Sequence, residues 1–87
     1  MRVDVFLDSV CLLKSRSLAK EACVRGKVLV NGEPAKGSRT VRAGDRIRLD
    51  LGVRVLEVEV VDLPARRVSR KDAEDYYRLL RDERVSL

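Results

Sequence analysis

The spacing of apolar residues in this chain changes at Gly26, and this change restricts the possible folds more than any other feature. Before Gly26 the apolar residues recur every three or four positions, which is typical of an amphipathic helix. After it Val28 and Val30 alternate with other residues, as in a half-buried strand. Asn31-Gly32 follows and predicts a tight hairpin, because both residues tolerate positive φ. The chain is therefore expected to open with helices and to continue as antiparallel sheet.

Two short helices are predicted before Gly26, separated by the sequence KSRS. The first should cover about residues 3–12, and its apolar residues at helical spacing are Val3, Phe6, Leu7, Val10 and Leu13. The second should cover about residues 18–25. Its expected buried side chains are Leu18 and Ala22, together with Ala19 and Cys23.

Serine and glycine are expected to mark the ends of the second helix. Ser15 or Ser17 can accept a hydrogen bond from a free N–H group of its first turn, and Ser17 is the expected cap. Gly26 stands where a left-handed C-terminal cap favours glycine.

The sheet is predicted to contain four or five short strands curled against the helices. Pro34 confines the strand after the hairpin to an edge. A short strand near residues 40–41 and a turn at residues 43–45 precede a strand with three side chains pointing inward: Ile47, Leu49 and Leu51. The next strand changes phase, which predicts a bulge near Val55-Leu56.

The segment after Pro64 is predicted to be a charged helix. Ser69 and Asp72 have the spacing of a capping box, with Asp in place of Glu or Gln. The apolar stripe of this helix would consist of Ala73, Tyr76, Tyr77 and Leu80. The chain is accordingly divided into a domain of residues 1–63 and a C-terminal helix of residues 64–87. The helix is either a solvated surface or a docking site for a partner.

Positive charge is concentrated in the first half of the chain. Residues 1–50 contain 11 Lys and Arg against 6 Asp and Glu, a net charge of +5, whereas residues 51–87 contain eight of each. The excess of positive charge is greatest in the window from Lys14 to Arg48, which has ten basic and three acidic residues. Clustered positive charge is typical of a nucleic-acid-binding surface, although it is also found on basic surfaces that bind only water.

The residue types present argue against several classes of function. The chain has no histidine, the commonest general base, and no glycine loop for phosphates, so no enzymatic activity is expected. Cys11 and Cys23 alone cannot complete a zinc site, so no metal or other cofactor is expected and both are interpreted as small buried hydrophobes. Three aromatic residues are too few for a base-stacking platform.

Membrane insertion and secretion are also not expected. No apolar run approaches eighteen residues, and Asp4 and Asp8 interrupt the N-terminal apolar stretch where a signal peptide would be uniformly apolar. The expected location is cytoplasmic, with no membrane partner.

Four motifs in order resemble the alpha-L RNA-binding motif, the domain shared with the fourth protein of the small ribosomal subunit and called the S-four domain. They read R-x-D-x-F-L, K-x-R-S-x-A, G-x-V-x-V-N-G and K-x-S-x-x-V-x-x-G-D, and together they cover about residues 2–50. The layout of the chain resembles that of the RqcP family, over nearly the full length but more weakly after residue 50. This family is related to the ribosome-associated fifteen-kilodalton heat-shock protein. Val5 departs from the family pattern, which has lysine at this position.

This resemblance implies a non-enzymatic factor in ribosome quality control. Its partners would be rRNA of the stalled large ribosomal subunit, peptidyl-tRNA and a tRNA-recruiting quality-control factor, and it would be a monomer off the ribosome. Its role would be to support C-terminal tailing of the stalled nascent chain.

The residues themselves predict which side chains contact RNA. Arg16 and Lys20, four positions apart, share one helix edge. Arginine can hold a phosphate bidentately and lysine acts as a point charge, while serine donates a hydrogen bond. The candidate RNA-binding residues are Arg2, Lys14, Arg16, Ser17, Lys20, Lys27, Asn31, Lys36, Ser38 and Arg39. Four of these residues have structural alternatives. Arg2 can pair with Asp4, and Asn31 can serve the turn. Ser17 can cap the second helix, and Lys20 can pair near Glu21 or face solvent.

Two other functions remain open on the sequence. The chain could be the RNA-targeting subunit of a separate rRNA-modifying enzyme such as a pseudouridine synthase, because S-four domains often precede such enzymes. It could also be a protein-interaction module that uses its last helix. Co-purification with a modifying enzyme would favour the targeting subunit. Binding to a protein partner that survives charge reversal at Arg16 and Lys20 would favour the protein-interaction module.

Overall fold

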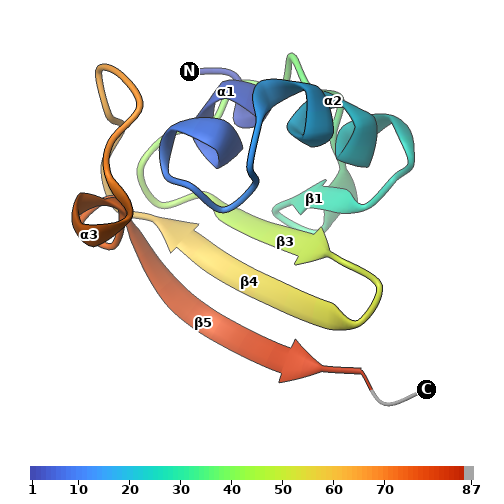
Figure 1. Cartoon of the computed structure of the whole chain (residues 1–87). Coiled ribbons are helices and arrows are strands. Elements are labelled where there is room, and N and C mark those ends of the chain that lie inside the picture. Colours follow the sequence, from blue (N-terminus) through green and yellow to red (C-terminus); the bar gives the residue numbers. More distant parts are fainter. Residues whose placement is uncertain (86–87) are drawn as a thin grey trace.

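The computed structural model describes residues 1–85 and consists of a five-stranded antiparallel sheet with two helices packed on one face (Figure 1). The helices are α1 (Val3–Ser9), α2 (Arg16–Val24) and α3 (Arg70–Ala73). The strands are β1 (Val28–Val30), β2 (Glu33–Pro34), β3 (Arg46–Asp50), β4 (Arg54–Val60) and β5 (Tyr77–Arg84). Their order across the sheet is β2-β1-β3-β4-β5. The predicted α+β fold with two N-terminal helices on a curled antiparallel sheet is confirmed.

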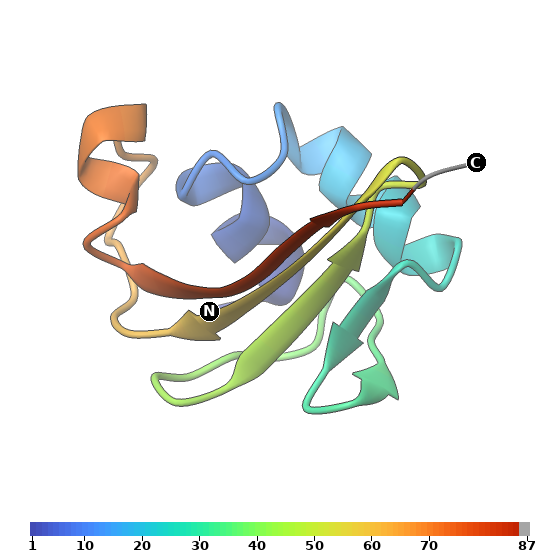
Figure 2. The same cartoon turned by 90° about the horizontal axis from the view of Figure 1, so that it is seen from below.

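The hydrophobic core lies between the helices and one face of the sheet. Side chains from both layers are almost fully buried there, including Phe6, Leu7, Ala19, Val28, Val30, Ile47, Leu49 and Val58. The opposite face of the sheet carries no helix among the described residues (Figure 2). The helices of residues 1–85 are too short and too polar to cross a membrane.

α1 ends at Ser9, three residues earlier than predicted. Cys11 takes φ +60°, and the N–H groups of Cys11 and Leu12 donate to the carbonyls of Asp8 and Leu7, both at 3.0 Å. These two bonds are those of a Schellman motif, in which the left-handed position is usually glycine. Because cysteine occupies that position here, the sequence carries no signal for the end of the helix.

α2 begins two residues earlier and ends one residue earlier than predicted, and Gly26 terminates it with φ +73° as expected. Its buried side chains are Ala19 and Cys23, with Ala22 packed at the edge of the core. Leu18 is 45% exposed, so the prediction that it is buried is wrong. The helix therefore lies on the sheet through small residues, which allows a close approach.

The hairpin after α2 is confirmed. Asn31 and Gly32 have φ values of +52° and +84°, and the flanking residues Val30 and Glu33 pair directly. These signs match the type I′ turn that suits the twist of antiparallel strands. Pro34 lies in β2, an edge strand of two residues, as predicted.

The predictions for the central strands need three corrections. Only a single bridge, between Arg2 and Thr40, forms where a short strand was expected near residues 40–41. Leu51 is exposed beyond the end of β3 instead of pointing inward. The bulge interrupts the pairing of β4 with β5 between Glu57 and Val58, because Leu80 is the extra residue on β5. The sequence phase change at Val55-Leu56 arises because both side chains are buried, on opposite faces of one regular strand.

The predicted C-terminal helix is largely wrong. Ser69 does cap a helix, with its hydroxyl oxygen accepting from the N–H of Asp72 at 3.3 Å, but α3 ends after four residues. Tyr77–Arg84 forms β5, which pairs along the whole of β4. An isolated helix would leave the N–H and C=O groups along that edge of β4 unpaired, whereas a strand satisfies them. Residues 86–87 of the predicted helix lie outside the described residues.

The boundary expected after residue 63 falls between two strands that pair in the same sheet. The division into residues 1–63 and residues 64–87 stays a prediction about folding units.

Candidate RNA-binding surface

Four of the predicted contact residues lie at the start of α2: Lys14, Arg16, Ser17 and Lys20, here called the α2 group. All four are exposed. Arg16 and Lys20 are four residues apart in the helix, so they lie on one side of it. Within residues 1–85 none of the three cations forms an ion pair, which leaves their charges available to a ligand.

The cap of α2 is Ser15, and the prediction that Ser17 caps the helix is wrong. Ser15 Oγ accepts a hydrogen bond from the N–H of Leu18 at 3.2 Å. The α-helix therefore starts at Arg16, and Ser17 lies in its first turn with an exposed side chain. The hydroxyl of Ser17 is therefore not occupied by capping, and its contact with RNA stays a prediction.

Four further predicted residues, here called the loop group, come together at the start of α1: Arg2, Lys36, Ser38 and Arg39. The loop after β2 is fastened to α1 by the N–H groups of Val3 and Asp4, which donate to the carbonyls of Arg39 at 2.7 Å and Gly37 at 3.2 Å. The structure thus places the loop that carries Lys36, Ser38 and Arg39 against the first turn of α1. Lys36, Ser38 and Arg39 are all exposed.

A buried carboxylate orients Arg2 within the loop group. Asp4 has no exposed side-chain surface and accepts from Arg2 Nε at 3.1 Å and Nη2 at 2.9 Å. The N–H of Val5 donates to the same carboxylate at 2.7 Å. The predicted pairing of Arg2 with Asp4 is confirmed, yet 45% of the Arg2 side chain stays exposed. One edge of the guanidinium is thus fixed by the protein while the remainder faces solvent.

Sequence reasoning named Asp4 as a partner for Arg2 but did not find that the carboxylate is buried under the loop. The signal was present, because Gly37 stands where any side chain would collide with Asp4: a Cβ there would lie 2.9 Å from Asp4 Oδ2. A glycine without positive φ indicates close approach of another group.

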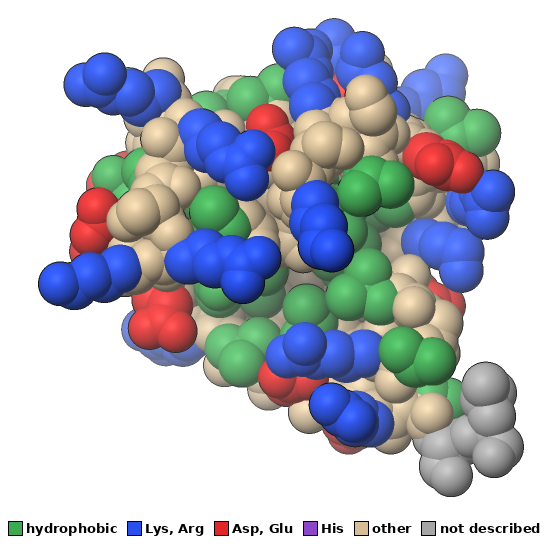
Figure 3. Space-filling view, in the orientation of Figure 1, with side chains coloured by type: hydrophobic (Ala, Val, Ile, Leu, Met, Phe, Trp, Pro, Cys, Tyr) green, Lys and Arg blue, Asp and Glu red, His purple; other side chains and the backbone are tan. Residues whose placement is uncertain are grey.

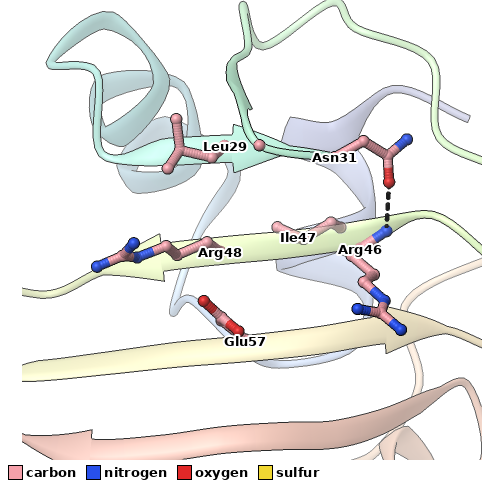
Figure 4. Close-up of a pocket in the computed structure, with 7 residues that line it drawn as sticks. Leu29, Asn31, Arg46, Ile47, Arg48 and Glu57 are labelled. Atoms are coloured by element: carbon pink, nitrogen blue, oxygen red, sulfur yellow. Dashed lines mark hydrogen bonds between the residues drawn. The ribbon is translucent and has the colours of Figure 1, made fainter.

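Asn31 is occupied by the protein's own backbone and side chains. Its Oδ1 accepts from the N–H of Arg46 at 2.9 Å, the bond drawn in Figure 4, and its Nδ2 donates to Asp45 at 3.1 Å. Asp45 also accepts from the N–H of Arg42 at 2.9 Å. Burial raises the pKa of Asp45, but the hydrogen bonds from Asn31 and Arg42 outweigh it and the net shift is downward. The structural role predicted for Asn31 is confirmed, and its contact with RNA stays a prediction.

Asn31 also borders a hollow of about 510 Å³ on the face of the sheet that carries no helix. Figure 4 shows Arg46, Arg48 and Glu57 around this hollow, with Leu29 across from them. Glu57 directly faces Arg48 in the strand register, so the charges there are mixed. This surface is a poorer anion site than the α2 and loop groups.

Lys27 lies between the helices and the sheet. Its N–H donates to the carbonyl of Ala22 at 2.9 Å, and its carbonyl accepts from the N–H of Asp50 at 2.9 Å. Its side chain is half-buried. The backbone of Lys27 therefore connects α2 to the sheet, and its side chain is the least accessible of the predicted cations.

Neither cysteine has the surroundings of a reactive thiol. Cys23 is buried in the core, and burial, followed by the negative charge of Asp4, raises its pKa. Cys11 is half-buried, and its Sγ donates to the carbonyl of Val68 at 3.3 Å. The prediction of a small buried hydrophobe is confirmed for Cys23, whereas Cys11 also makes a polar contact. In residues 1–85 no group of three or more Cys, Asp or Glu could hold a metal ion.

The α2 group and the loop group both lie on the helical side of the molecule. In Figure 1 the loop after β2 rises beside α1 and α2, and Figure 3 shows Lys and Arg side chains gathered above these helices. Exposed cations with few aromatic residues suit recognition of a folded RNA through its backbone and shape.

Comparisons with known proteins give the family of the chain. The S4 domain family matches residues 1–47. An RQC P-site tRNA stabilizing factor of Helicobacter pylori is 44% identical over 77 residues, which cover 87% of this chain and 92% of the relative. The factor of the same name from Halalkalibacterium halodurans is 35% identical and covers 99% of this chain and 97% of its own. That of Bacillus subtilis is 34% identical and covers 98% of both chains.

Solved structures support the same assignment over the full fold. The trimeric structure of Vibrio cholerae Heat Shock Protein 15 has a TM-score of 0.86 and 32% identity, covering 91% of this chain and 80% of that one. The solution structure of the hypothetical protein HP1423 has a TM-score of 0.80 and 42% identity, covering 95% of this chain and 100% of that one. The chain therefore belongs to the S4 domain family and, within it, to the family of RQC P-site tRNA stabilizing factors.

Proposed function

We propose that this protein is an RNA-binding factor of ribosome quality control that acts by binding and not by catalysis. In this function the α2 and loop groups hold phosphates of rRNA of the large ribosomal subunit and of peptidyl-tRNA on a stalled subunit. The protein then supports C-terminal tailing of the stalled chain together with a tRNA-recruiting factor, in the cytoplasm. The relatives named RQC P-site tRNA stabilizing factor support the pathway.

The observation that carries this proposal is the pair Arg16 and Lys20 on one exposed helix edge with no ion pair in the described chain. The N–H groups in the first turn of α2 lie beside them and favour an anion. The loop group adds Lys36 and Arg39. If about six cations each neutralise one phosphate, affinity falls roughly 10³-fold between 50 and 200 mM salt.

Arg2 contributes a preoriented contact to the proposed surface. Its two hydrogen bonds to Asp4 fix the guanidinium before RNA arrives, so less side-chain freedom is lost on binding. The buried carboxylate partly offsets the positive charge of Arg2. We therefore expect Arg2 to act through geometry more than through net charge.

Sedimentation of the tagged full-length protein through a sucrose gradient tests the proposal. The wild type is expected in the large-subunit fractions of a lysate from cells with stalled translation, and Arg16→Glu, Lys20→Glu is expected at the top. Arg48→Glu, Arg84→Glu is the matched control, because it reverses two exposed arginines away from the α2 and loop groups and should sediment like the wild type. Thermal melts establish that both variants are folded.

Wild-type protein that remains at the top of the gradient would overturn the ribosome assignment. Its co-purification with an RNA-modifying enzyme would then favour a targeting subunit. Equal loss of binding in both double variants would show that net charge, and not the α2 group, determines the result.

A further inference from the structure

A second basic segment lies outside the residues matched by the S4 domain family. Residues 64–71 contain four basic residues and no acidic one, although residues 51–87 as a whole are neutral. Arg67 pairs with Asp8 at 2.9 Å. The other three cations are exposed and form no ion pair within residues 1–85: Arg66, Arg70 and Lys71, here called the second basic cluster.

The segment is held firmly against the end of α1. Besides the ion pair of Arg67, the N–H of Val68 donates to the carbonyl of Ser9 at 2.9 Å, and Cys11 Sγ donates to the carbonyl of Val68 at 3.3 Å. Arg70 and Lys71 then follow in the first turn of α3, which Ser69 caps. A backbone fixed at this many points presents its cations in a defined arrangement, which lowers the entropy lost when a ligand binds.

The cluster lies on the same side of the molecule as the α2 and loop groups. Figure 1 places α3 and the loop before it beside α1, on the side away from α2. Figure 3, in the same orientation, shows Lys and Arg side chains over this part of the surface as well as above α1 and α2. Basic side chains thus extend across the helical side of a molecule whose long axis is 37 Å.

Acidic residues follow the cluster directly in the sequence. Asp72 lies in the single turn of α3, and Glu74 and Asp75 come after it, so a polyanion would be repelled past Lys71. An extended anion that binds here is therefore directed back across α1 toward the other cations. This charge pattern fits an RNA strand that continues from the α2 group better than it fits a separate acidic ligand.

We propose that Arg66, Arg70 and Lys71 form a second phosphate-binding surface that contacts a further segment of the RNA bound at the α2 and loop groups. The inference rests on the proposed function, since it extends the same RNA contact. Each phosphate contact steepens the dependence of log Kobs on log salt concentration by about 0.9 for a duplex. Three contacts steepen this slope by about 2.7, which corresponds to a roughly 40-fold greater loss of affinity between 50 and 200 mM salt.

The test compares two triple variants with the same loss of charge. Arg66→Ala, Arg70→Ala, Lys71→Ala removes the cluster, and Arg46→Ala, Arg48→Ala, Arg78→Ala removes three exposed arginines from the sheet. Fluorescent RNA hairpins with stems of about 6 and about 18 base pairs are titrated at several salt concentrations. At ~3.4 Å per base pair, an upper limit for RNA, the long axis of the protein corresponds to about 11 base pairs, so only the longer stem spans both surfaces.

For the longer hairpin, removal of the cluster should reduce the salt slope by 2 to 3, and the sheet variant should reduce it by less than 1. For the shorter hairpin, removal of the cluster should change affinity by no more than about twofold. The second surface would be overturned if the two variants had equal salt slopes, or if neither variant differed from the wild type in its salt slope. Either result would leave the proposed function intact. Failure of the wild type to bind either hairpin would instead overturn the proposed function, and the second surface with it.

Discussion

The contact between Gly37 and Asp4 predicts a large effect from a single methyl group. In Gly37→Ala the new Cβ would lie 2.9 Å from Asp4 Oδ2, whereas ordinary contact begins near 3.4 Å, so one side must move by about 0.5 Å. Asp4 cannot move freely, because Arg2 and the N–H of Val5 hold its carboxylate at 2.7 to 3.1 Å. Overpacking of this kind costs about 1–3 kcal/mol.

Taking about 2 kcal/mol, the melting temperature of a domain of this size should fall by roughly 8–16 °C. Thermal unfolding followed by circular dichroism measures this change. Because the displaced loop carries Lys36 and Arg39, RNA affinity measured below the melting temperature should fall as well.

A double-mutant cycle isolates the cause. Asp4→Ala removes the side chain that the new methyl group would strike, so Gly37→Ala should cost less than about 0.5 kcal/mol in that background. The interaction energy between the two positions is then about 1.5 kcal/mol. Additive effects of the two substitutions, to within about 0.5 kcal/mol, would refute the packing of Asp4 under the loop.

Three further predictions concern the frame of the domain. Asn31→Ala should lower the free energy of unfolding in urea by about 1–3 kcal/mol, because the N–H of Arg46 and the carboxylate of Asp45 both lose a partner; an unchanged urea midpoint would contradict this. The pKa of Asp45 is lowered in the folded protein, so its carboxylate contributes to stability above its unfolded pKa of about 3.9, and this contribution is lost as the pH falls through the folded pKa. Asp45→Asn should therefore remove this part of the acid-unfolding curve. Superimposable acid-unfolding curves for the variant and the wild type would contradict this prediction. A chromogenic disulfide reagent should label Cys11 before Cys23, whose thiol is buried and has a raised pKa, and equal rates would show that the core opens more readily than its packing indicates.

The parts of the fold that the sequence predicted correctly are those with local physical causes. Asn31-Gly32 and Gly26 adopt positive φ as their residue types favour, and the alternation through β1 and β3 matches the buried face of each strand. The exposure of Arg16 and Lys20 follows from the same helical periodicity.

The largest errors occur where distant parts of the chain decide the outcome. The helical spacing of Ala73, Tyr76, Tyr77 and Leu80 is compatible with a helix in isolation, but the unpaired edge of β4 is available only in the folded sheet. Tyr77, the first residue of β5, also suits a strand. The docking of the loop group on α1 likewise depends on the buried Asp4 carboxylate, which lies far from Gly37 in the sequence.

The two edges of the sheet are protected in different ways, and this affects how the protein behaves when crowded. β2 has only two residues, one of which is Pro34 and lacks an N–H. β5 is eight residues long, but five of these are charged and Leu80 interrupts the regular pairing. Neither edge offers a flat, apolar ladder to a strand from another molecule. Both edges of the sheet therefore resist edge-to-edge aggregation: β2 because it is short, and β5 because it is charged and irregularly paired.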